Sequence, residues 1–154
     1  MQVREILSHK GARLLTVTPD TTLSTCIATM AEEDIGSLVV IDAGKLAGML
    51  TFREVLKVFA IRHKEGRSVS NSPVLDIAVR QVMVTNPQVV APDMDINELR
   101  RMMIENHSRY LPVMDKDTLL GVVSFHDVAK AVLGEQTFEN RMLKAYIGDY
   151  PVES

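Results

Sequence analysis

The stretch Gly121-Val122-Val123-Ser124-Phe125-His126-Asp127-Val128 decides the fold, because its pattern occurs twice in the chain. The earlier copy is Gly48-Met49-Leu50-Thr51-Phe52-Arg53-Glu54-Val55, which begins 73 positions before it (48 against 121). In each copy an apolar run that favours a strand meets a Ser/Thr-x-x-Asp/Glu motif, and a pattern that favours a helix follows. The sequence therefore predicts that one strand–turn–helix corner is built twice.

The repeat extends well beyond these corners. Residues 17–57 align with residues 90–130 without a gap, and 13 of the 41 pairs are identical. Each copy predicts a short strand, a Pro-Asp turn, a helix, two strands joined by a tight turn, and a closing helix. The short strands are expected at 14–17 and 88–90, and residues 74–83 are expected to form a short helix that leads into the second repeat. We therefore expect an α+β fold of two β-α-β-β-α repeats related by a pseudo-twofold axis.

The chain divides into four predicted segments. They are a first repeat (1–66), a linker (67–77) that contains Ser, Asn and Pro, a second repeat (78–134), and a C-terminal helix and tail (135–154). In the last segment apolar residues recur at helical spacing, at Phe138, Met142, Leu143, Tyr146 and Ile147. This spacing predicts an amphipathic helix outside the repeats, whose apolar face needs a partner.

Composition excludes several classes of protein. With 46% hydrophobic and 24% charged residues, the 154-residue chain is typical of a soluble globular protein. A net charge of −3 argues against a nucleic-acid surface. The apolar runs are too short to span a bilayer, and no N-terminal signal segment is predicted. Cys26, the one cysteine, reads as a small core residue, and the lack of a disulfide framework fits a cytoplasmic protein.

The Ser124-x-x-Asp127 corner has two interpretations. Locally it is a capping box, in which the two side chains bond to each other's backbone N–H groups, and Thr51-x-x-Glu54 fits the same description. The unpaired N–H groups of a helix start also attract phosphate, and a carboxylate beside them can accept both hydroxyls of a ribose. Under the second interpretation the two corners give two nucleotide sites.

The duplicated unit resembles paired cystathionine-beta-synthase (CBS) domains, also called a Bateman module. The resemblance covers Val3 to about Leu133 and rests on the doubled corner and on Arg109-Tyr110-Leu111-Pro112-Val113. The tail from Glu135 is similar to the end of small bacterial stand-alone CBS pairs. The resemblance implies a regulatory adenosine-containing ligand (AMP, ADP, ATP, NAD or S-adenosylmethionine) and no required cofactor.

The resemblance also assigns roles at the second corner. It implies that Asp127 holds the ribose diol, that Ser124 holds a phosphate oxygen, and that Arg109 is the phosphate cation. The residues implied around them are Val122, Tyr110 and His126, together with Arg13 and Thr16 of the segment 11–16 that leads into the first repeat.

The first corner departs from the family pattern. Its implied site residues are Thr51, Arg53, Glu54 and Ser37, with Gly36 and Met49 beside them and Thr85 and Asn86 from the other lead-in segment. Glu54 replaces the usual Asp and moves the carboxylate by one methylene. Gly36-Ser37 replaces Arg109-Tyr110 and removes a cation, so we expect the second corner to bind more tightly.

No enzyme is predicted. The four histidines lack metal-ligand spacing, and no GxxxxGK loop is present, so we expect neither a metal site nor catalytic residues. The alternative function is a protein-interaction or dimerisation module with degenerate, unoccupied sites. The resemblance further implies a homodimer, and a separate regulated protein is the other partner we consider.

Overall fold

The computed structural model describes residues 1–11, 14–66 and 73–147 of the chain. Its elements follow in the order α1 (Val3–Lys10), β1 (Thr16–Val17), α2 (Leu23–Glu33), β2 (Ser37–Asp42), β3 (Lys45–Thr51), α3 (Phe52–Lys64), η1 (Pro73–Asp76), η2 (Val79–Gln81), β4 (Val84–Thr85), α4 (Ile96–Asn106), β5 (Tyr110–Asp115), β6 (Thr118–Ser124) and α5 (Phe125–Ile147). The predicted α+β class with two repeats and a C-terminal helix is confirmed.

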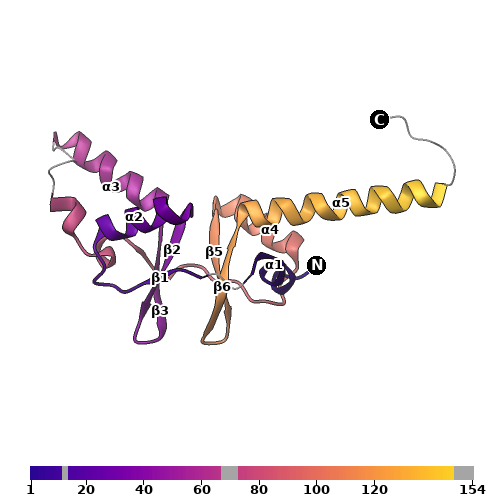
Figure 1. Cartoon of the computed structure of the whole chain (residues 1–154), viewed down its shortest axis with the longest axis horizontal. Coiled ribbons are helices and arrows are strands. Elements are labelled where there is room, and N and C mark those ends of the chain that lie inside the picture. The colour runs from indigo at the N-terminus through magenta and orange to yellow at the C-terminus, as the bar shows by residue number, and fades with distance from the viewer. Residues whose placement is uncertain (12–13, 67–72, 148–154) are drawn as a thin grey trace.

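The two repeats share their backbone geometry in detail. The β2–β3 and β5–β6 hairpins have the same antiparallel register, with the same irregularity after Val40 and after Val113. Asp34 and His107, which end α2 and α4, both adopt a left-handed conformation with φ of 53° and 54°. The hairpins lie side by side with their turns at the same end, and helices α2 to α5 lie toward the other end (Figure 1).

The segment that precedes each repeat in the sequence packs against the other repeat. Val3 and Ile6 of α1 are buried in the core of the second repeat, and the Val3 N–H donates to the Met94 carbonyl at 3.0 Å. Val79 of η2 is buried in the core of the first repeat, and its N–H donates to the Thr21 carbonyl at 2.8 Å. The chain therefore crosses from one repeat to the other immediately after α1.

Two predicted elements differ from the structure. The helix expected over 74–83 is two short 3-10 turns, because the backbone between them pairs with the first repeat: Ala78 bridges Thr22, and the Leu23 N–H donates to the Ile77 carbonyl at 2.9 Å. The strand expected at 88–90 is reduced to one parallel bridge between Val90 and Val113.

Helix α5 continues without a break from the second corner into the predicted tail. Two separate helices were expected, but Gly134 does not end the first, since one glycine in a helix costs only about 1 kcal/mol relative to alanine. The first half packs against α4, α1 and β6, and the second half extends away from the body (Figure 1). No helix among the described residues has the length and apolarity needed to cross a membrane.

Candidate functional site

The second corner forms the reciprocal bonds of a capping box at the start of α5. The Ser124 N–H donates to Asp127 Oδ2 at 2.9 Å, and the Asp127 N–H donates to Ser124 Oγ at 3.0 Å. Strand β6 ends at Ser124, so the sheet fixes the direction in which the helix begins. The capping interpretation is therefore correct for this corner, and a ligand would have to bind to a carboxylate that also caps the helix.

A lysine that we did not predict contacts the same carboxylate. Lys10, the last residue of α1, donates to Asp127 Oδ2 at 2.9 Å and to the Val122 carbonyl at 3.0 Å. Burial by itself raises the pKa of Asp127, but the hydrogen bonds from Lys10 and Ser124 outweigh it and hold that pKa below its usual value. Asp127 is therefore ionised at neutral pH and already paired with a cation.

The first corner is more tightly closed. Both the N–H and the hydroxyl of Thr51 donate to Glu54 Oε1, each at 2.8 Å, and Glu54 is only 9% exposed. The extra methylene lets the glutamate fold back onto its own cap. Because of this closure, we still expect the first corner to be the weaker ligand site.

A cavity of about 1030 Å³ lies between the repeats and is lined from both corners. From the second repeat it takes Ser124, His126 and Val122, and from the first it takes Ser37 and Arg53. Among the described residues, the charged side chains along it, histidines aside, are three cations and one carboxylate: Lys10, Arg53, Arg109 and Asp34. A net positive lining attracts anions, and the helix N-terminus that begins at Phe125 adds partial positive charge.

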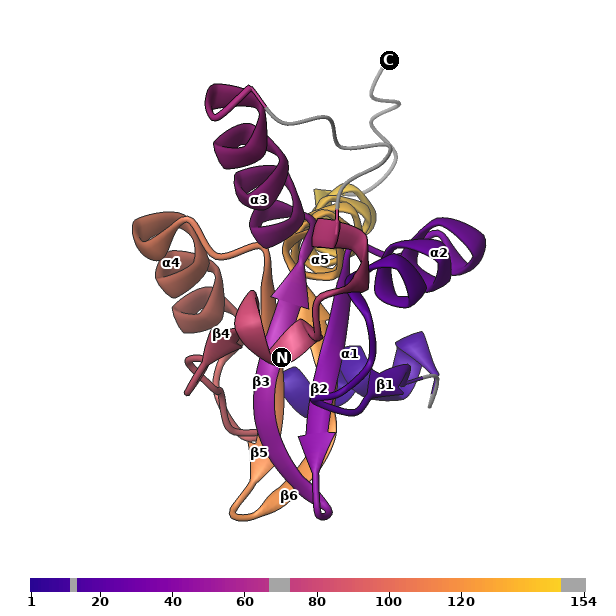
Figure 2. The ribbon, with the colours of Figure 1, turned by 90° about the vertical axis from the view of Figure 1, so that its left-hand side faces the viewer.

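Contacts across the cleft connect the repeats. Arg53, from the start of α3, donates through Nη2 to the His107 carbonyl at the end of α4, at 2.7 Å. The guanidinium of Arg109 lies over the Phe52 ring, 5.6 Å from its centroid. Phe52 also packs edge-on against Tyr110, with 6.2 Å between the ring centroids. Arg53 and Arg109 thus each contact the other repeat (Figure 2 shows the repeats one behind the other).

The family model for the CBS domain matches residues 3–61 and 79–134, which is most of the chain. This chain belongs to the CBS domain family. Each matched segment contains one of the two corners, at Thr51–Glu54 and at Ser124–Asp127.

The CBS pair is also similar to individual proteins. It is 29% identical over 152 residues to the "CBS domain-containing protein CBSX3, mitochondrial" of Arabidopsis thaliana, which covers 94% of this chain and 71% of that protein. A solved "putative signal-transduction protein with CBS domains" from Burkholderia ambifaria superposes with a TM-score of 0.76 at 29% identity, over 88% of this chain and 96% of that one. The solved CBSX2 in complex with AMP shares the fold, with a TM-score of 0.70 at 23% identity, over 88% and 98%.

The structure brings most of the predicted site residues of this CBS pair to the cleft. Those that line the large cavity are Ser124, His126, Arg109, Tyr110, Val122, Ser37 and Arg53. A smaller cavity of about 210 Å³ is lined by Thr51, Arg53 and Glu54, together with Arg109 and Tyr110. Asp127 lines a third cavity, of about 700 Å³, between α1 and α5, which it shares with Lys10 and His126.

Two of the predicted residues are not among those that line these cavities. Thr16 in β1 and Thr85 in β4 are exposed and are not among the described residues that line any of the three. Leu14 and Leu15 line the large cavity from the same lead-in segment, and Val84 lines the small one. Arg13 lies outside the described residues.

Sequence reasoning missed Lys10, Phe52 and the carbonyl of His107. Lys10 is one residue before the segment 11–16 that we nominated, and its helix gave no local sign that it reaches a corner more than 110 positions away. Phe52 aligns with an identical residue, Phe125, in the second repeat, but this identity does not show which side chains Phe52 contacts. Within the described residues, no group of three or more His, Cys, Asp or Glu side chains could hold a metal ion.

Proposed function

We propose that this CBS pair is a regulatory module that binds a phosphate-bearing adenosine ligand in the cleft between its repeats. The observation that carries the proposal is that two helix N-termini open on one cleft whose charged side chains are mainly cations. A helix N-terminus and nearby arginine or lysine side chains are the groups that bind phosphate in proteins.

The second corner is the principal site in this proposal. The Asp127 carboxylate lies in the cavity between α1 and α5, which shares Lys10 and His126 with the cleft, and there it accepts the ribose hydroxyls. The Ser124 hydroxyl and the N-terminus of α5 bind a phosphate oxygen. Arg109 supplies the cation, and its position over the Phe52 ring leaves its planar donors beside the cavity. Val122 and Tyr110 line the wall where the base packs.

The charge of the cleft selects among the ligands of this class. AMP, ADP, ATP and NAD carry phosphate, which the cations of the cleft attract. S-adenosylmethionine carries a positively charged sulfonium and no phosphate, and its one anionic group is the carboxylate of its methionine part, so it gains less from Arg53 and Arg109 than a phosphate does. AMP is the ligand in the solved CBSX2 complex, and its phosphate matches the cations here.

The regulatory step is a shift between arrangements of the two repeats. A ligand in the cleft contacts both repeats and changes their equilibrium by its difference in affinity for the two arrangements. We propose that the module acts as a cytoplasmic homodimer, whose interface includes the exposed apolar face of α5, and that a separate protein senses the shift. The module itself performs no reaction in this proposal.

Thermal unfolding with a panel of ligands tests the proposal. AMP, ATP and NAD should raise the melting temperature saturably, because ligand that binds only the folded state stabilises it. S-adenosylmethionine should raise it less at equal concentration. The Arg109→Ala variant should reduce the AMP shift more than the adenosine shift, because it removes a phosphate contact. No shift with any ligand at millimolar concentration would contradict the proposal and favour the interaction module with empty sites.

A further inference from the structure

The ammonium of Lys10 contacts the carboxylate to which the proposed function assigns the ligand's sugar. Lys10 and Ser124 both donate to Oδ2 of Asp127, and within the described residues no hydrogen bond reaches Oδ1. Each oxygen of a carboxylate offers about two acceptor sites. A sugar diol that uses both oxygens of Asp127 therefore competes with Lys10 for Oδ2.

At the first corner, no cation of the described residues contacts Glu54 as Lys10 contacts Asp127. There the outer edge of β3 is paired with strand β4, and Met49 lies opposite Val84. Val122 occupies the position equivalent to Met49, 73 residues later, but its strand β6 pairs with β5 alone and α1 lies against it. The carbonyl of Val122 accepts from Lys10 instead of from a strand. The lysine contact is thus specific to the second corner.

Lys10 also lies close to the point where the chain passes from the second repeat to the first. Helix α1 is fixed in the second repeat by Val3 and Ile6, which are buried there. A few residues after Lys10 the chain enters β1, which pairs with β2 of the first repeat. The Lys10 contacts therefore hold the end of α1, and with it the start of this crossing, against the second corner.

We propose that the Lys10–Asp127 ion pair competes with the ligand's sugar diol, so that binding at the second corner displaces Lys10 and acts on the crossing between the repeats. This inference rests on the proposed function and adds a residue that couples the site to the arrangement of the module. The side chain of Lys10 is 37% exposed and that of Asp127 is 18% exposed. Because solvent screens a partly exposed ion pair, its contribution to the free energy is small, and a ligand's hydrogen bonds can replace it.

Calorimetric titration of the full chain with adenosine and with 2′-deoxyadenosine tests the inference. Adenosine has the diol and no phosphate, so its affinity reports the competition without a contribution from charge attraction. Lys10→Met should bind adenosine roughly two- to fivefold more tightly than wild type, because a partly exposed ion pair no longer has to be broken. Its affinity for 2′-deoxyadenosine, which has no diol, should equal that of wild type.

Lys45→Met is the matched control. It removes one exposed lysine at a hairpin turn and should change neither affinity. If wild type binds adenosine and Lys10→Met binds it equally or less tightly, the competition is refuted while the proposed function remains. If neither protein binds any adenosine ligand, both proposals fail together. Binding by Lys10→Met alone would support the competition in its strongest form.

Discussion

At the scale of single residues, the two corners differ in the way their carboxylates are used. Glu54 directs one oxygen onto the N–H and hydroxyl of Thr51 and is nearly buried, whereas Asp127 shares its Oδ2 between Ser124 and Lys10. Glu54 thus bonds to its own cap residue, whereas Asp127 bonds to its cap residue and also to a lysine. Variants of the two acids can therefore test which corner binds a ligand more tightly.

The first prediction compares alanine variants of the two acids. Asp127→Ala should lower the affinity for AMP about tenfold or more, since hydrogen bonds to a charged group contribute about 1.5–3 kcal/mol. Glu54→Ala should lower it far less, because Glu54 is occupied by its own cap. Titration calorimetry measures both affinities, and circular dichroism checks that both variants are folded. Equal losses would contradict the ranking.

The second prediction concerns the pH dependence that Asp127 gives to stability. Its pKa is lower in the folded chain than its usual value, so the ionised carboxylate stabilises the fold above about pH 4, and this contribution is lost as the pH falls through the lower folded pKa. Asp127→Asn should therefore lower the free energy of unfolding by about 1 kcal/mol at pH 7, and the gap should shrink toward pH 3. Urea unfolding at both pH values measures the gap, and a gap that widens in acid would contradict the assignment.

At the scale of elements, the repeat glycines Gly48 and Gly121 show why each lead-in lies where it does. A Cβ on Gly48 would lie 2.6 Å from Met83 Sδ and 2.7 Å from the Val84 carbonyl oxygen. A Cβ on Gly121 would lie 3.1 Å from Leu7 Cδ2, the end of a side chain that can move. Both glycines allow a neighbouring segment to approach closely. Backbone lies against Gly48, whereas a leucine side chain lies against Gly121.

The third prediction follows from this contrast. Gly48→Ala should lower the free energy of unfolding by about 1–3 kcal/mol, because β4 cannot pair with β3 at its present distance. Gly121→Ala should lower it by less than about 1 kcal/mol, because Leu7 can adjust. Urea unfolding of the two variants makes the comparison, and each serves as the control for the other. A larger loss at Gly121 would show that α1 is held more rigidly than β4.

The sequence predicted the helices and strands best where the same pattern of residues occurs in both repeats. Both hairpins, both capping boxes and helices α2 and α4 lie where periodicity and turn residues placed them. It failed where long-range contacts decide the local structure: residues 77–78 pair with the first repeat instead of forming a helix, and Lys10 reaches a corner distant in sequence. No local pattern carries that information.

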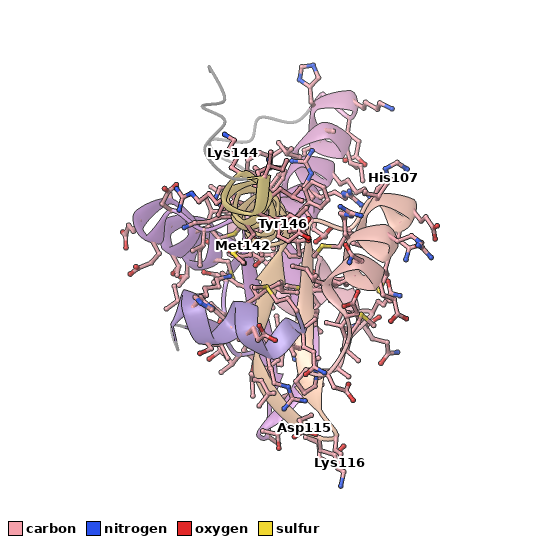
Figure 3. The ribbon with its side chains drawn as sticks, turned by 90° about the vertical axis from the view of Figure 1, so that its right-hand side faces the viewer. His107, Asp115, Lys116, Met142, Lys144 and Tyr146 are labelled. Atoms are coloured by element: carbon pink, nitrogen blue, oxygen red, sulfur yellow. The ribbon has the colours of Figure 1, made fainter. Side chains whose placement is uncertain are left out.

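At the scale of the whole molecule, the second half of α5 extends beyond the body of the two repeats (Figure 1). Its last turns carry exposed apolar side chains at Met142, Leu143, Tyr146 and Ile147, and Tyr146 is 90% exposed (Figure 3). An isolated helical segment of this length is only marginally stable in water without packing. An exposed apolar stripe of this kind marks an interaction surface, and the homodimer proposed above would cover it.

The last prediction is that this stripe holds the dimer together. Met142→Glu with Leu143→Glu should convert a dimer of the 17.1 kDa chain into a monomer, because two charges cannot be buried in an apolar interface without partners. Light scattering coupled to size-exclusion chromatography gives the mass. Lys144→Glu changes charge at an adjoining position of the same helix, away from the centre of the stripe, and should leave the dimer intact (Figure 3). The monomeric variant should still bind AMP, since the cleft is formed within one chain; a dimer that survives both charges would place the interface elsewhere.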